Sequence, residues 1–118
     1  FLHDTALAQP AITVLQLIAT PKATSTLHHA LNNTQDISIR TAITKALGTL
    51  QYAPALEDIT KDTRSTNRDL KFTALFALAN IGSPDSRNVL QKAVSSSKGY
   101  DKIEAKAMLA LHQRQAQK

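Results

Sequence analysis

Apolar residues recur at helical spacing in the stretch 70–84, and the same pattern returns before and after it. In this central copy the apolar positions are Leu70, Ala74, Ala77, Leu78 and Ile81. At about 100° per residue these side chains form one stripe along a helix. Gly82 and Pro84 then predict the end of that helix and the start of another. The sequence therefore predicts a helical hairpin as its repeating unit.

The copies of this pattern are evenly spaced along the chain. Leu15, Leu47, Leu78 and Leu111 align at steps of 32, 31 and 33 residues. A period of this size is typical of solenoids, in which each helical pair buries its apolar face against its neighbours. We therefore expect an all-α fold, an α-solenoid of stacked antiparallel helical hairpins. It would form a single domain over residues 1–118, with units at 1–35, 36–66 and 67–99 and a partial unit at 100–118.

Several boundaries follow from local signals. Pro10 fits a first helical position, so we expect one helix to end within residues 3–8 and another to cover residues 11–18. Asp36 or Ser38 would cap the helix that follows them. The polar run 61–69 has no apolar period and is predicted to be a solvated loop.

The last unit is incomplete in sequence. Its apolar stripe is Ile103, Ala107, Ala110 and Leu111. A polar tail follows in place of a second helix, and the chain begins with Phe1 rather than Met. We therefore expect a fragment or processed product that stops inside a longer array.

Composition narrows the class of protein. Hydrophobic residues make up 42% of the chain and aromatic residues 4%, with no cysteine and no tryptophan. The core must then consist of Leu, Ile, Val and Ala, which suits closely packed helices. No run approaches the ~20 apolar residues of a membrane span, so we expect a soluble protein without membrane insertion. The absence of cysteine excludes disulfide and thiol chemistry, but does not distinguish a cytoplasmic from an exported, periplasmic location.

The four histidines do not form a metal-binding pattern. His28 and His29 are adjacent, so they would point about 100° apart on a helix. His3 and His112 lie near opposite ends of the chain. No two histidines have the i, i+4 spacing of helical metal ligands, and we predict that they are exposed polar residues.

The carboxylates do not suggest catalysis either. Glu57, Asp58 and Asp62 lie beside Lys61 and Arg64, which is typical of a solvated helix face. The chain has no Gly-rich phosphate loop and no nucleophile elbow. We therefore expect no enzyme activity, no cofactor and no metal.

The positive charge raises a nucleic-acid hypothesis. The formal net charge is +5, and Lys61, Arg64, Arg68 and Lys71 form one cluster that could contact phosphates. However, no Tyr or Trp lies among these residues for base stacking, and carboxylates are mixed with them. A solvated surface of a basic protein is the favoured interpretation.

Two segments carry a recognisable motif. Residues 36–48 have Asp36, Ile39 and Arg40 followed by Ala and Leu-Gly, and residues 67–79 repeat this spacing from Asn67 through Lys71. Over nearly the whole chain, this pattern resembles HEAT repeats, and in particular the short HEAT-like repeats of phycobilisome lyases. The resemblance implies a HEAT-like, armadillo-type superhelix.

The resemblance also implies roles for individual residues. The cations at the motif position would form a ladder between repeats, with Arg40 and Lys71 as rungs and Asp36 and Asn67 as their acceptors. Glu104 occupies the corresponding position in the last unit and interrupts the ladder.

The second helices of the hairpins would line the concave surface, as the resemblance implies. Opposite their core stripe, these helices carry Phe72, Leu75, Phe76, Met108 and Leu109, with Lys45 at a corresponding polar position. One interpretation is that helix rotation or neighbouring helices bury these apolar residues. The other is a hydrophobic strip that receives a partner's helix or a second copy of the domain.

We therefore expect a non-catalytic protein–protein interaction scaffold, or a HEAT-repeat domain of a larger protein, that binds its partner through the concave second-helix face. One alternative, which rests on the resemblance, is a lyase-type or chaperone-like subunit acting on a tetrapyrrole-bearing protein. Another is a nucleic-acid-binding module that uses the basic surface.

Overall fold

The computed structural model describes residues 5–116, and the side-chain environments of residues 10–114. Every regular element in this part of the chain is helical, which confirms the predicted all-α class. The helices are α1 (Thr5–Ile18), α2 (Pro21–Asn33), α3 (Ile37–Thr49), α4 (Leu56–Asp62), α5 (Arg68–Ile81), α6 (Pro84–Ser96) and α7 (Tyr100–Ala116). A short 3₁₀ turn, η1 (Ala53–Ala55), leads into α4.

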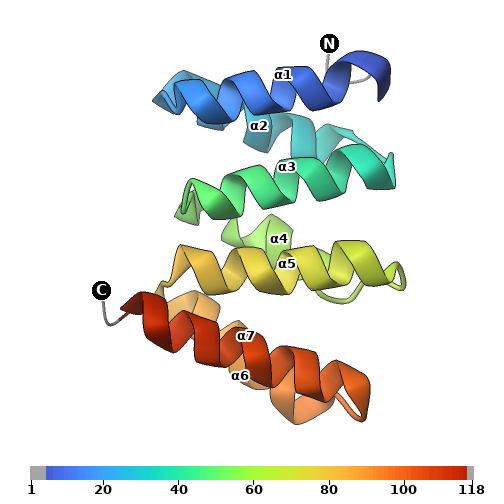
Figure 1. The fold of residues 1–118 in the computed structure, drawn as a ribbon, viewed down its shortest axis with the longest axis vertical. Helices are drawn as coiled ribbons and strands as arrows, with labels where there is room; N and C mark the ends of the chain where they lie inside the picture. The colour runs from blue at the N-terminus through green and yellow to red at the C-terminus, as the bar shows by residue number, and fades with distance from the viewer. Residues whose placement is uncertain (1–4, 117–118) are drawn as a thin grey trace.

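The helices form two layers (Figure 1). Helices α1, α3, α5 and α7 lie side by side and run in the same direction, and each packs against the next. Helices α2, α4 and α6 lie behind them, where α2 packs on α1 and α3, α4 on α5, and α6 on α5 and α7. This alternation is the predicted α-solenoid. We refer to the two layers as the odd layer and the even layer.

The four evenly spaced leucines lie one on each helix of the odd layer. Leu47 and Leu78 are fully buried, and Leu15 and Leu111 are partly buried against the same core. The repeat in the sequence is therefore also a repeat in space, because each step of the pattern adds one helix to the row.

Side-chain caps explain where most helices begin. Thr20, Asp36, Asn67 and Ser83 each accept a hydrogen bond from the backbone N–H three residues later. Such a cap satisfies one of the N–H groups that lack an intrahelical acceptor. Of the two caps that the sequence allowed for α3, the structure has Asp36.

Two predicted boundaries are wrong. Helix α1 is continuous through Pro10. Pro10 is the sixth residue of α1, where a proline removes one intrahelical hydrogen bond and crowds the preceding turn, which can kink a helix without ending it. The prediction that a helix ends within residues 3–8 also includes residues 3 and 4, which lie outside the described residues. The polar run 61–69 is also not one loop, because α4 extends to Asp62 and α5 begins at Arg68.

The core is built mainly from Leu, Ile and Ala, with α3 and α5 at its centre. Its largest fully buried apolar side chains are Leu27, Leu31, Ile43, Leu47, Ile59, Leu75, Leu78 and Leu90. Gly48 of α3 lies so close to α5 that a Cβ atom on it would be 2.6 Å from both Cα and Cβ of Ala77. Small residues on both helices therefore allow this close approach.

Helix α7 buries a different face from the one that the sequence predicted. Ile103, Ala107 and Ala110 of the predicted stripe are exposed, whereas Ala105 and Met108 are buried. Helix α7 packs against α5 and α6, and the buried residues lie on the side that meets these two helices. Helices α3 and α5 each pack against a helix of the odd layer on both sides, whereas α7 has one such described neighbour, so different faces are buried.

Candidate functional site

The residues predicted to bind a partner differ widely in their accessibility. Phe72 is 42% exposed, and Lys45 is also exposed. Phe76 and Leu109 are half-buried against the core, whereas Leu75 and Met108 are buried. Phe72 is therefore the apolar member of the set that solvent reaches most freely.

Exposed large apolar side chains are confined to the odd layer. Among residues 10–114 they are Val14, Leu17, Ile18, Ile37, Phe72, Tyr100 and Ile103. None of the described side chains of α2, α4 or α6 is among them. The two layers therefore present surfaces of different chemistry, although both contribute to the same core.

Four of these side chains lie close to the N-terminal ends of their helices. Ile37 and Tyr100 are the first residues of α3 and α7, Ile103 is the fourth residue of α7, and Phe72 is the fifth residue of α5. Because the helices of the odd layer run in the same direction, these ends lie along one side of the layer (Figure 1). We call these four residues the apolar edge.

The sequence pattern had indicated only Phe72 among the residues of the apolar edge. Ile37 precedes the apolar stripe of its helix, and Tyr100 begins a helix directly after Gly99. Ile103 belongs to the predicted core stripe of α7 but is exposed in the structure. These residues could have been found in the sequence as apolar residues that lie close to a helix start and outside the buried stripe of that helix.

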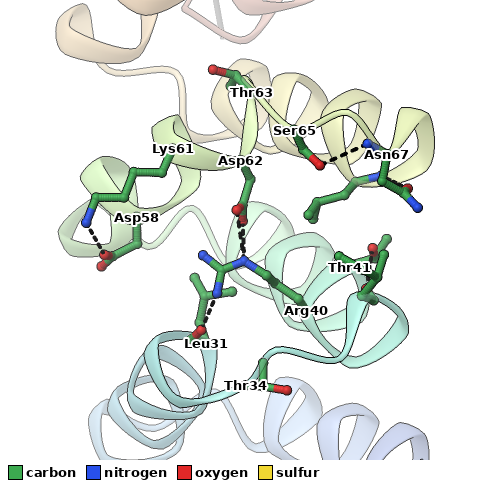
Figure 2. Close-up of polar contacts among 12 residues, drawn as sticks. Leu31, Thr34, Arg40, Thr41, Asp58, Lys61, Asp62, Thr63, Ser65 and Asn67 are labelled. Carbon is green, nitrogen blue, oxygen red and sulfur yellow. Dashed lines mark hydrogen bonds and ion pairs between the residues drawn. The ribbon is translucent and has the colours of Figure 1, made fainter.

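Arg40 of α3 joins three helices (Figure 2). Its Nε donates to the Asp62 carboxylate, at 2.8 Å from Oδ1 and 3.0 Å from Oδ2. Its Nη1 donates to the carbonyl oxygen of Leu31, at 2.5 Å. The side chains of Arg40 and Asp62 are only 18% and 8% exposed. This contact fastens α3 to the C-terminal ends of α2 and α4.

The acceptor of Arg40 thus differs from the one that the resemblance implied. Asp36 and Asn67 instead accept from the backbone N–H groups of Ile39 and Leu70, each at 3.1 Å. Because Asp36 and Asn67 are short side chains that cap their own helices, they are held at those helix starts and do not act as acceptors for the ladder cations. Asp62, which the sequence pattern placed on a solvated face, is buried because it is paired with Arg40.

The two capped loops are built alike. The hydroxyl oxygen of Thr34 accepts from the Asp36 N–H at 3.2 Å, and that of Ser65 accepts from the Asn67 N–H at 3.1 Å. Both loops appear in Figure 2. The repeat therefore includes a hydroxyl residue two positions before the N-cap residue. This residue is Thr34 before Asp36 and Ser65 before Asn67.

Lys71 and Arg68 connect α5 to α7. The Lys71 Nζ lies 3.0 Å from the Asp101 carboxylate. Arg68 Nη2 lies 3.4 Å from the Glu104 carboxylate, and its guanidinium lies 5.2 Å from the centre of the Tyr100 ring. Glu104, at the position where a ladder cation was expected, therefore receives a cation from the preceding helix of the odd layer.

These ion pairs change the interpretation of the basic cluster. Lys71 and Arg68 are paired with carboxylates of α7, and Lys61 lies 3.9 Å from Asp58. Among the described side chains, Arg64 is the member of the cluster that forms no ion pair. Lys61, Arg68 and Lys71 are thus paired within the fold, which does not favour a phosphate-binding surface made by the cluster as a whole.

Two histidines are less exposed than predicted. His28 is half-buried, and its Nε2 lies 2.6 Å from Asp58 Oδ2. His112 is 3% exposed, and its Nε2 lies 2.8 Å from the Ser83 carbonyl oxygen. Both use a ring nitrogen to join neighbouring helical pairs. The described residues contain no cluster of three or more His, Asp or Glu side chains that could hold a metal ion.

Residues 70–96 match the family model described as PBS lyase HEAT-like repeat. The match begins at the third residue of α5 and ends at the last residue of α6, so it covers one helical hairpin. HEAT-like repeats are generally non-catalytic. No curated protein matches the chain. Of the described helices, none has both the length and the apolar character needed to cross a membrane.

Proposed function

Because residues 70–96 match a HEAT-like repeat and the helices form an α-solenoid, we propose that this chain is a non-catalytic scaffold that binds a protein partner through its odd layer. The odd layer contains the helices that carry the predicted partner-binding residues Lys45, Phe72 and Met108. Its most accessible apolar anchor is Phe72, in the middle of the apolar edge.

The observation that carries this proposal is the one-sided distribution of exposed apolar side chains. All seven large apolar side chains that are exposed among residues 10–114 belong to the odd layer. Single exposed apolar residues are ordinary on a protein surface, but a group rimmed by polar residues is typical of interaction sites. Aromatic residues are also over-represented among the residues that dominate binding energy.

The spacing of the apolar edge favours a helical partner. Neighbouring packed helices lie about 8–10 Å apart, so Ile37, Phe72 and Tyr100 lie on successive helices of the row at a similar interval. In a partner helix, residues seven apart lie on the same face at a separation of about 10.5 Å. An amphipathic helix laid across the row could therefore place one apolar residue against each helix.

The charge of the chain supports an acidic partner. The formal net charge is +5. Arg68 lies one turn before Phe72 on α5, and its side chain is 67% exposed despite its contact with Glu104. Lys45 is exposed on α3. Carboxylates flanking the apolar residues of the partner would meet these cations, which would raise the association rate at low salt.

A photo-crosslinking experiment identifies the partner and its site together. Benzoylphenylalanine is placed at Phe72 in one protein and at Gln91, an exposed residue of α6, in another. We expect a discrete crosslinked species from position 72 that is absent from position 91. Equal crosslinking at both positions would contradict a one-sided binding surface.

The identified partner is then titrated against variants. We expect Phe72→Ser to weaken binding by about tenfold or more, as the loss of an aromatic anchor typically does. Leu17→Ser is the matched control, because it removes an apolar side chain that is 80% exposed but lies outside the apolar edge. Far-ultraviolet circular dichroism verifies that both variants fold. Equal affinities of Phe72→Ser and the wild type would remove Phe72 from the site.

A second candidate is a lyase-type or chaperone-like subunit acting on a tetrapyrrole-bearing protein. It is supported by the description of the family that residues 70–96 match. Incubation with a tetrapyrrole and its acceptor protein tests it through the absorption change on chromophore attachment. An unchanged rate of attachment in the presence of the chain would reject this candidate.

A further inference from the structure

A cleft with a volume of about 650 Å³ lies where α4, α5 and α6 meet the start of α7. Helices α4 and α6 both pack on α5, and the cleft is lined by residues of all three helices and of the loops that follow α4 and α6. Its volume is in the range of small-molecule sites, about 300–1,000 Å³.

The charged residues of the cleft are strongly unbalanced. Four cations line it, Arg64, Lys71, Lys92 and Lys98, against the single carboxylate of Asp101. That carboxylate lies 3.0 Å from the Lys71 Nζ. Arg64, Lys92 and Lys98 form no ion pair with any described side chain. Three uncompensated cations from three separate segments therefore surround one hollow, which concentrates positive potential there.

Four hydroxyl residues line the cleft, Thr60, Thr63, Ser96 and Ser97, and three of them already donate within the fold. Thr60, Thr63 and Ser96 donate their protons to backbone carbonyl oxygens, at 2.7, 2.6 and 2.9 Å. Their hydrogens are thus engaged within the fold. The donors left for a ligand are chiefly the ammonium and guanidinium groups, which bind carboxylate and phosphate oxygens through charge-assisted hydrogen bonds.

The remaining wall of the cleft is apolar. Val89 and Ala93 of α6 are partly exposed, and Leu75 of α5 lies buried beside them. Long lysine side chains can cover apolar surface with their stems while the charged ends reach outward. A ligand with an uncharged body and anionic ends would match both parts of this surface.

We propose that this cleft binds a small organic anion that carries at least two negative charges, as phosphate or carboxylate, on an apolar body. Arg64, Lys92 and Lys98 bind the anionic groups, and Val89 and Ala93 contact the body. Lys71 stays paired with Asp101 and holds the start of α7 against α5. No residue of the apolar edge lines the cleft, and the existence of this site does not depend on the proposed scaffold function.

Titration calorimetry with two aromatic probes, and with inorganic phosphate for comparison, tests the proposal. It also shows whether the cleft prefers phosphate or carboxylate. Phenyl phosphate and phenylsuccinate present the same ring with a phosphate or with two carboxylates, and inorganic phosphate lacks the apolar body. We expect saturable binding of at least one aromatic probe, tighter than that of inorganic phosphate. In a methyl-labelled sample, the Val89 resonances should shift with the same saturation curve.

Two triple variants with equal charge change separate a site from general attraction. The cleft variant combines Arg64→Gln, Lys92→Gln and Lys98→Gln. The control combines Lys45→Gln, Lys106→Gln and Arg114→Gln, three exposed cations outside the cleft that form no ion pair with a described side chain. We expect the cleft variant to lose about tenfold or more in affinity, and the control less than about twofold.

Three outcomes would overturn the proposal. The first is the absence of saturable binding for both aromatic probes. The second is an equal loss of affinity in the two triple variants, which would show diffuse electrostatic attraction. The third is binding of duplex DNA that the cleft variant abolishes while neither aromatic probe binds, which would assign these cations to a nucleic-acid surface.

Discussion

At the residue scale, Gly48 lies where α3 and α5 come closest. A Cβ atom there would be 2.6 Å from Cα and Cβ of Ala77, a separation that real side chains do not adopt. An alanine at this position would therefore push the two central helices apart. The glycine is needed for close packing within the row rather than for a turn.

We expect Gly48→Ala to lower the free energy of unfolding by about 1–2 kcal/mol. Overpacking typically costs about 1–3 kcal/mol, and we expect about 2–3 kcal/mol here because the clash involves the backbone Cα of Ala77. The better helix propensity of alanine returns about 1 kcal/mol. Thr49→Ala is the control, because Thr49 is exposed on the same helix and gains propensity without a steric clash. Urea denaturation measures both variants. A gain in stability from Gly48→Ala would contradict the observed helix contact.

Sequence patterns show apolar burial but not close approach or charge pairing. Gly48 carries no side chain and therefore adds nothing to an apolar stripe, so the periodicity of its helix gives it no packing role. Asp62 lay in a polar run and was expected in solvent, although it is buried beside Arg40. The role of each residue depends on a partner that lies 20 to 30 residues away in the sequence. The apolar periodicity of a single helix gives no information about such a partner.

At the element scale, the contact of Arg40 with Asp62 and Leu31 fastens α3 to two helices of the even layer. The contact of Arg68 with Glu104 also joins two helices, but the Arg68 side chain is 67% exposed. Water and salt screen the second pair more strongly. The two pairs should therefore contribute very differently to stability.

We expect Asp62→Asn to lower the free energy of unfolding by about 2–3 kcal/mol, because Arg40 is left without its counter-charge in a poorly solvated position. The matched substitution Glu104→Gln should cost less than about 1 kcal/mol. Both changes remove one negative charge with little change in shape. Equal effects in urea denaturation would show that the Arg40 contact is no stronger than a surface pair.

The elements themselves were largely predictable, because each helix carries its own period, cap or proline. The helix starts at Ile37 and Pro84 were predicted from a cap and a proline, whereas α5 starts at Arg68, inside the run that was predicted to be a loop. The orientation of α7 was not predictable in this way, since apolar residues surround that helix and only its contacts with α5 and α6 select the buried face. The unit boundaries at 1–35, 36–66, 67–99 and 100–118 stay a prediction.

At the scale of the whole molecule, a row of parallel helices is backed by a second layer, and the two layers differ in surface chemistry. The odd layer carries the exposed apolar side chains, whereas the cationic cleft opens beside α4 and α6 of the even layer. The cleft and the apolar edge share no residue, so a protein partner and a small anion would contact different side chains.

The central claim is that each helical pair is stabilised mainly by stacking on its neighbours. Helices α3 and α5 have neighbours in the odd layer on both sides, whereas α7 has a single described neighbour in that layer. In a stack of this kind, stability falls toward the ends.

Amide hydrogen exchange, followed residue by residue in the intact chain, tests this most directly. We expect the slowest exchange in α3 and α5, with protection decreasing toward α1 and toward α7. Protection in α7 equal to that in α3 and α5 would contradict stabilisation by stacking.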